Sequence, residues 1–91
     1  MPTVGFVETS ARLAAQETAV LKALVDCRGR VVSRRELARL AGIADLSDRR
    51  CDSLLVAIRR VLGSDAIRTV RGRGWMIVPL AVDRAEVLLA A

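Results

Sequence analysis

Residues 47–75 have the sequence SDRRCDSLLVAIRRVLGSDAIRTVRGRGW, and this pattern predicts a helix followed by a tight hairpin. On a helix that turns about 100° per residue, apolar side chains spaced i, i+4, i+7 and i+11 share one narrow face. We expect this face to be buried, Ser47 to cap the first turn, and Gly63 to end the helix in the left-handed conformation. The apolar residues concerned are Cys51, Leu55, Ile58 and Leu62.

The opposite face of the same helix is polar and basic. A basic helix face, taken alone, is more often solvated surface than a binding site. The residues on it, at the same spacing, are Arg49, Ser53, Val56 and Arg60, with Ala57 beside them.

A hairpin is expected after the helix, because two extended runs, residues 67–71 and 75–78, flank the sequence Gly72-Arg73-Gly74. Glycine supplies the positive φ angles that tight hairpins need. Arginines flank the turn, and a purely structural hairpin has no need of them. The helix and the hairpin together suit the major groove of DNA and the neighbouring minor groove.

Two further helices are expected before residue 47, at about residues 13–27 and 33–41. The second has the start signal of a capping box and a hydrophobic staple, formed by Ser33 with Glu36 and by Val32 with Leu37. Two helices, a turn, a longer helix and a hairpin predict a three-helix winged helix-turn-helix with a C-terminal β-hairpin wing. The fold class is therefore mainly α with small β (α+β).

The chain divides into three expected segments. Residues 1–12 hold at most one short strand, around Val4 and Phe6; residues 13–79 form the winged helix-turn-helix domain. Residues 80–91 are a C-terminal extension in which Asp83 could cap one or two helical turns. Its apolar end is expected to fold back on the core rather than meet another chain.

The 91 residues are enough for one small domain. Hydrophobic residues make up 53% of the chain, with one Trp and one Phe, so we expect an aliphatic core. No apolar run approaches the ~20 residues of a membrane-spanning helix, and the N-terminal sequence is not organised like a signal peptide. We expect a soluble, cytoplasmic protein with no membrane partner.

The positive charge is concentrated in one part of the chain. The net charge is +5, yet residues 28–73 contain twelve arginines and five acidic residues, a local charge of +7. Guanidinium groups bind phosphates and guanine edges in a bidentate way that lysine cannot. A nucleic acid is therefore expected as the partner, ahead of a membrane, because no helix combines a basic face with bulky aromatic anchors.

Cysteine and histidine usage argues against a metal or catalytic site. The chain has two cysteines and no histidine, so a Cys/His zinc site and the usual base of a nucleophilic triad are missing. A Cys27–Cys51 disulfide would need the two Cα atoms within about 7 Å. We expect Cys51 to act instead as a small buried hydrophobic residue, and we expect no cofactor.

An enzyme is also not expected from the carboxylates. Asp48 and Asp52 are four residues apart on the predicted helix, but arginines surround them. We expect these carboxylates to hold Arg49 or Arg59.

Several motifs occur together in the order of a known domain. The most specific is Thr69-Val70-Arg71-Gly72-x-Gly74-Trp75; the others are GRVVSRREL at residues 29–37, Arg49 with Asp52, and Ile58-Arg59-Arg60 with Leu62. In these motifs the chain resembles the winged-helix DNA-binding domain of OmpR/PhoB-type response regulators over residues 13–78. That family usually has Tyr in place of Trp75.

The resemblance implies a transcriptional regulator that binds double-stranded DNA. It implies that the recognition helix, residues 48–62, lies in the major groove and the wing, residues 67–78, in the minor groove, which Arg71 enters. It also implies backbone contacts by Thr69, Gly72, Arg49 and Arg59. Charge and resemblance together give the candidate DNA-binding residues Arg30, Arg49, Ser53, Val56, Ala57, Arg59, Arg60, Thr69, Arg71, Gly72 and Arg73.

The chain departs from the family on the recognition helix, where Leu54, Val56 and Ala57 are apolar. Val56 suits contact with a thymine methyl group. Taken as an exposed contact surface, this apolar patch supports a second hypothesis, a winged helix that binds protein, for example as an appendage of a uroporphyrinogen-III synthase-like protein. Whether the domain is stand-alone or excised stays open, as does a homodimer. Activation by phosphorylation is not expected, because the chain has no receiver domain.

Overall fold

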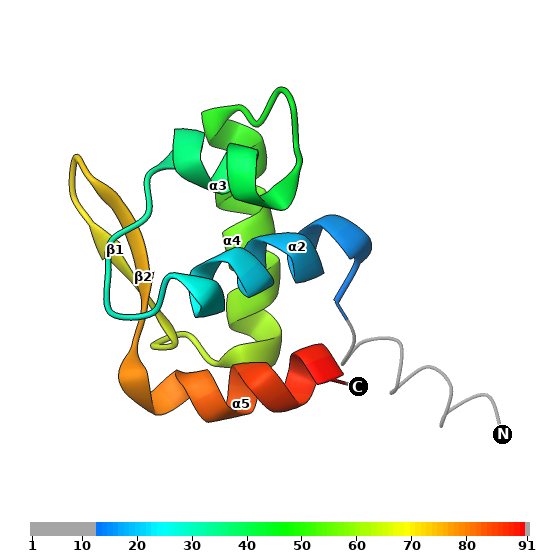
Figure 1. Ribbon diagram of the computed structural model, residues 1–91, viewed down its shortest axis with the longest axis vertical. Helices are drawn as coiled ribbons and strands as arrows, with labels where there is room; N and C mark the ends of the chain where they lie inside the picture. The colour runs from blue at the N-terminus through cyan, green and yellow to red at the C-terminus, as the bar shows by residue number, and fades with distance from the viewer. Residues whose placement is uncertain (1–12, 91) are drawn as a thin grey trace, which may run out of the picture.

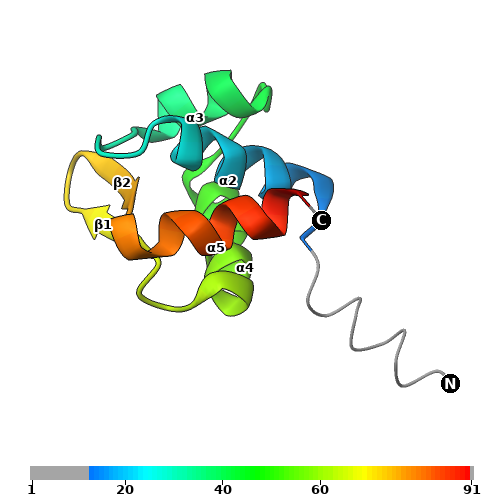
Figure 2. The same cartoon turned by 60° about the horizontal axis from the view of Figure 1, so that its bottom comes forward.

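The computed structural model describes residues 13–90 (Figure 1). This part of the chain forms α2 (Ala15–Asp26), α3 (Arg34–Ala41), α4 (Asp48–Leu62), β1 (Ile67–Val70), β2 (Gly74–Ile77) and α5 (Pro79–Ala90). Helix α2 contacts α3, α4 and α5, and the hairpin lies at one side of the helices (Figures 1 and 2). The predicted fold class is confirmed: a winged helix-turn-helix, mainly helical with a small antiparallel sheet. The strand expected near Val4 and Phe6 lies outside the described residues.

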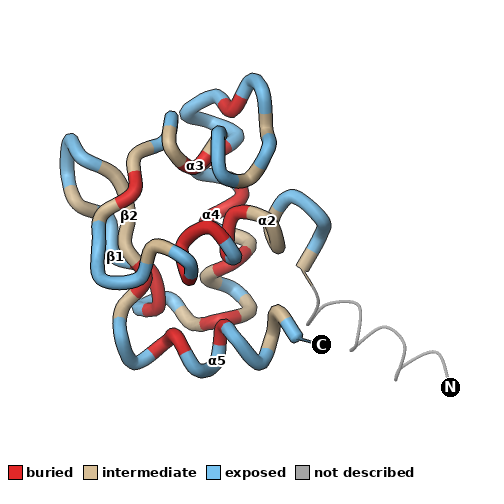
Figure 3. The backbone as a smooth tube through the Cα atoms, viewed as in Figure 1, coloured by how far each residue is buried: buried red, intermediate tan, exposed pale blue. Residues whose placement is uncertain are grey.

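One aliphatic core joins the helices and the hairpin, as Figure 3 shows by burial. The predicted buried face of α4 is confirmed, since Cys51, Leu55, Ile58 and Leu62 are all buried. Leu54 is buried as well, with 1% of its surface exposed, so the expectation that it belongs to an exposed patch was wrong. The buried arc of α4 is broader than the narrow stripe inferred from the spacing, as is usual for a helix packed on a globular core.

The helix ends follow the predicted signals with two differences. Ser47 accepts a hydrogen bond from the Arg50 backbone N–H at 3.1 Å, and Ser33 accepts one from the Glu36 N–H at 3.1 Å. The Glu36 carboxylate, however, binds Arg30 instead of completing a capping box. Gly63 has φ 119° and ψ 143°, so the expected left-handed helical conformation was wrong. Its N–H still donates to the Arg59 carbonyl, and its own carbonyl accepts from the Ala66 N–H at 3.1 Å in the turn that follows α4.

The hairpin is anchored by a contact that the sequence did not predict. Val70 pairs with Gly74, so the turn consists of residues 71–73, one residue earlier than expected. Val32, in the connection between α2 and α3, pairs antiparallel with Trp75. The Val32 N–H donates to the Trp75 carbonyl at 2.7 Å, and the Trp75 N–H donates back at 2.9 Å. The base of the wing is therefore fixed to the connection that leads into α3.

Gly74 is needed where these two segments approach each other. Its φ is +142°, and a Cβ atom built on it would lie 2.1 Å from the Val32 carbonyl oxygen. Gly72, at the tip, has φ +73° but nothing within 4 Å of the corresponding position. The two glycines of the Gly-x-Gly motif therefore serve different purposes, a left-handed turn and a close backbone approach.

Gly74→Ala and Gly72→Ala form a matched pair. The strained φ alone costs about 1–2 kcal/mol in Gly72→Ala, and Gly74→Ala should cost at least about 1 kcal/mol more because Val32 must move. Denaturant unfolding measures both free energies, and the fluorescence of Trp75, the one tryptophan in the chain, reports the Val32 contact. Equal losses in the two variants would contradict the close approach at Gly74.

Helix α5 is longer than the sequence indicated. It begins at Pro79 and not near Asp83, and proline suits the first position of a helix. Ala81, Val82 and Ala85 are buried against α2 and α4, while Val87 is 72% exposed. No helix within residues 13–90 has the length and apolar character needed to cross a membrane.

Neither cysteine forms a disulfide. Cys27 and Cys51 are free, and Cys51 is fully buried on the inner face of α4. Burial raises the pKa of the Cys51 thiol to about 11, so Cys51 behaves as the small hydrophobic residue that was expected.

Candidate nucleic-acid interface

The outward face of α4 carries polar and cationic side chains around one apolar residue. Arg49, Ser53, Val56 and Arg60 are all exposed, and Val56 has 46% of its surface exposed. Ala57 is half-buried beside them. Because Leu54 is buried, the apolar part of this face is limited to Val56 and the exposed edge of Ala57.

The wing tip is the second exposed cationic element. Arg71, Gly72 and Arg73 form the turn between β1 and β2, and all three are exposed (Figure 3). The tip and the starts of α3 and α4 border one open hollow, whose lining includes Gly72 and Arg73 from the wing and Arg34 and Asp48 from the helices. The fold thus brings the wing tip near the N-terminal end of α4.

Four arginines of these two elements have no partner among residues 13–90. The hydrogen bonds and ion pairs within that range leave their guanidinium groups unengaged. They are Arg49 and Arg60 on α4 and Arg71 and Arg73 at the wing tip. These cations are available to an external anion.

Arg59 has a different role, because it connects α4 to the wing. It is half-buried, and its Nη2 donates to the Ile67 carbonyl at 2.8 Å and to Thr69 Oγ1 at 3.0 Å. The expectation that Asp48 or Asp52 would hold Arg49 or Arg59 was therefore wrong. Arg49 has no partner among residues 13–90, and Arg59 lies on the side of α4 that faces β1. The hydrogen bond between Arg59 and Thr69 therefore lies at the junction of α4 and the wing, and the Thr69 side chain is exposed there.

Asp48 pairs with Arg34, a contact that sequence reasoning missed. Arg34 Nε lies 2.6 Å from Asp48 Oδ1, and Arg34 Nη1 donates to the Leu46 carbonyl. Arg34 therefore ties the first residue of α3 to the turn and to the first residue of α4. No local pattern signals this contact, since the partners are twelve or more residues apart. It connects the two helices of the helix-turn-helix at the protein surface.

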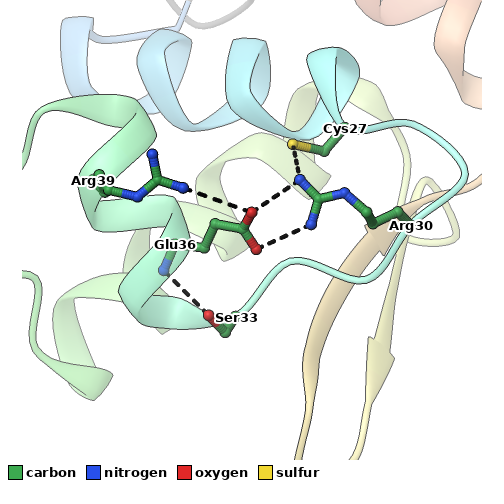
Figure 4. A network of polar contacts seen from close by, with 5 residues as sticks. All are labelled: Cys27, Arg30, Ser33, Glu36 and Arg39. Carbon is green, nitrogen blue, oxygen red and sulfur yellow. Dashed lines mark hydrogen bonds and ion pairs between the residues drawn. The ribbon is translucent and has the colours of Figure 1, made fainter.

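Arg30 is also engaged, in a polar cluster between α2 and α3 (Figure 4). Its two terminal nitrogens donate to Glu36 at 3.1 and 2.9 Å, and Nη2 also donates to Cys27 Sγ at 3.2 Å. The hydrogen bond from Arg30 lowers the pKa of Glu36. Arg39 lies 3.8 Å from the same carboxylate. The positive charge of Arg30 is thus largely compensated within the fold.

The predicted site residues therefore fall into four groups. The outward face of α4 holds Arg49, Ser53, Val56, Ala57 and Arg60; the wing tip holds Arg71, Gly72 and Arg73. Arg59 and Thr69 join the two elements, and Arg30 lies apart in the connection between α2 and α3.

Comparison with known proteins gives one match. The model of the family described as "Transcriptional regulatory protein, C terminal" matches residues 8–77, which include α2, α3, α4 and both strands of the wing. Neither the curated proteins nor the solved structures gave a match. The match ends at the last residue of β2, so α5 lies outside the matched residues. The family consists of DNA-binding regulatory domains and is not an enzyme family. With most of its length matched, the chain belongs to the OmpR/PhoB-type C-terminal effector domains of transcriptional regulatory proteins.

Proposed function

We propose that this domain binds double-stranded DNA with α4 in the major groove and the β1–β2 wing in the neighbouring minor groove. The observation that carries the proposal is the set of four exposed arginines without partners among the described residues, two on α4 and two at the wing tip. Unpaired guanidinium groups on adjacent elements can neutralise phosphates and release the counterions of the duplex.

The candidate residues then have distinct tasks. Arg49 and Arg60 bind phosphates at the two ends of the α4 face, and Ser53, Val56 and Ala57 lie toward the base edges. Arg59 acts through Thr69 by holding the wing at its angle to α4. Gly72 allows the backbone to approach the duplex, while the compensated Arg30 contributes less. In this role the protein regulates transcription in the bacterial cytoplasm, where the DNA is.

Arg71→Ala tests the wing. Narrow, A·T-rich minor grooves have enhanced negative potential that attracts arginine. We therefore expect the variant to bind duplex DNA more weakly, with a larger loss on A·T-rich than on G·C-rich duplexes. Affinity is measured by fluorescence anisotropy on both duplexes, and circular dichroism checks the fold.

Arg28→Ala is the matched control, because it removes the same charge from a residue that pairs with Glu86 of α5. The loss of DNA affinity in Arg28→Ala should be smaller than in Arg71→Ala and the same on A·T-rich and G·C-rich duplexes. If Arg71→Ala binds both duplexes like the parent chain, the wing is not a minor-groove reader. A protein-binding domain would also tolerate Arg71→Ala and would instead be damaged by Val56→Asp, but the burial of Leu54 leaves little apolar surface for such a partner.

A further inference from the structure

The middle of the α4 face is chemically unlike its ends. Arg49 and Arg60 are eleven residues apart, which places them about 16 Å apart along the helix axis. Between them, on the same line, are Ser53 and Val56, both exposed and both uncharged. The centre of the face therefore has one short hydroxyl group and one branched apolar side chain.

Among the described residues of α4, Val56 is the only large apolar side chain that is exposed, with 46% of its surface accessible. The other aliphatic residues of the helix, among them Leu54, Leu55 and Ile58, turn inward to the core. Burying an apolar side chain against another apolar group is favourable, at about 0.8 kcal/mol per methylene. An apolar group on the surface that α4 meets would therefore gain free energy from contact with Val56.

The major groove offers one such counterpart. Guanine, adenine and cytosine present hydrogen-bond donors and acceptors there, whereas thymine adds the C5-methyl group. A valine has no donor or acceptor for the polar edges, but its two methyl groups can pack on that C5-methyl group. Phosphates bound by Arg49 and Arg60 would fix the register of α4 along the groove.

We infer that Val56 is a specificity-determining residue, which packs against the C5-methyl group of a thymine in the major groove. This inference rests on the proposed binding of α4 to DNA. It adds that the preferred duplex carries thymine at the position facing the centre of α4. Base preference at this position then comes from apolar contact and not from a bidentate hydrogen bond.

The test removes the methyl group from the DNA. Two duplexes are compared, alternating dA–dT and the same length of alternating dA–dU, which differ by the thymine methyl groups alone. The parent chain should bind the thymine duplex about fourfold more tightly, the equivalent of about 0.8 kcal/mol. In Val56→Ala, the ratio of the affinity for the thymine duplex to that for the uracil duplex should fall close to one.

Leu40→Ala is the matched control, because Leu40 on α3 is 43% exposed, much like Val56, but is not on the α4 face. It should keep the parent ratio. Equal binding of the two duplexes by the parent chain, or an unchanged ratio in Val56→Ala, would overturn the thymine contact. Either result would leave salt-dependent DNA binding by the arginines intact. If the parent chain showed no salt-dependent DNA binding at all, the proposed function itself would be refuted.

Discussion

Leu55→Ala is expected to lower the free energy of unfolding by about 2–5 kcal/mol. Leu55 has 1% of its surface exposed and belongs to the same buried core as Leu21, Leu24 and Leu37. Truncation removes apolar burial and leaves a cavity among side chains from three helices. A domain of this size has a small margin of stability, so the variant should unfold at a much lower denaturant concentration.

Val56→Ala provides the control at the next position of the same helix. Val56 is 46% exposed, so its truncation should change stability by no more than about 0.5 kcal/mol. Chemical denaturation followed by circular dichroism measures both variants. An unchanged midpoint for Leu55→Ala, or equal losses at the two positions, would mean that α4 is rotated from the orientation described above.

The parts of the fold that the sequence predicted depend on local interactions. The inner face of α4 follows from the spacing of apolar residues along one helix. The starts of α3 and α4 follow from Ser33 and Ser47, whose hydroxyl groups bond to backbone N–H groups three residues later. The hairpin follows from glycines at positions where φ is positive. In each case the partners are close in the sequence, so the pattern contains the information.

The features that the sequence did not predict depend on partners far apart in the chain. Val32 and Trp75 are 43 positions apart, and their pairing is what makes Gly74 a site of close approach. Arg34 finds Asp48 only after α3 and α4 have packed. Similarly, the burial of Leu54 depends on how far neighbouring elements cover α4 and not on its own position in the repeat.

The candidate site shows the same division. Composition identified a basic segment, and the helical repeat placed Arg49 and Arg60 on the outward face. Composition alone could not distinguish them from Arg30 and Arg59, which carry the same charge in the same segment. The folded structure separates them, because Glu36 compensates Arg30 and β1 engages Arg59. This separation has a measurable consequence for DNA binding.

Affinity for random duplex DNA is expected to fall steeply with salt. If Arg49, Arg60, Arg71 and Arg73 neutralise four phosphates, log K should fall against log salt concentration with a slope of about −3.6, at about −0.9 per contact. Between 50 and 200 mM salt, that slope corresponds to an affinity loss of about 150-fold. A titration at four salt concentrations in this range measures the slope, and a flat response would contradict DNA binding by this surface.

Two variants with the same charge change then separate the free arginines from the compensated one. Arg60→Gln should make the slope less steep by about 0.9, because one phosphate contact is lost. Arg30→Gln should leave the slope close to that of the parent chain, because Glu36 already holds the Arg30 guanidinium in the free protein. If the two variants reduce the slope equally, Arg30 leaves Glu36 to bind DNA, and the contacts of the free protein do not predict which cations reach the duplex.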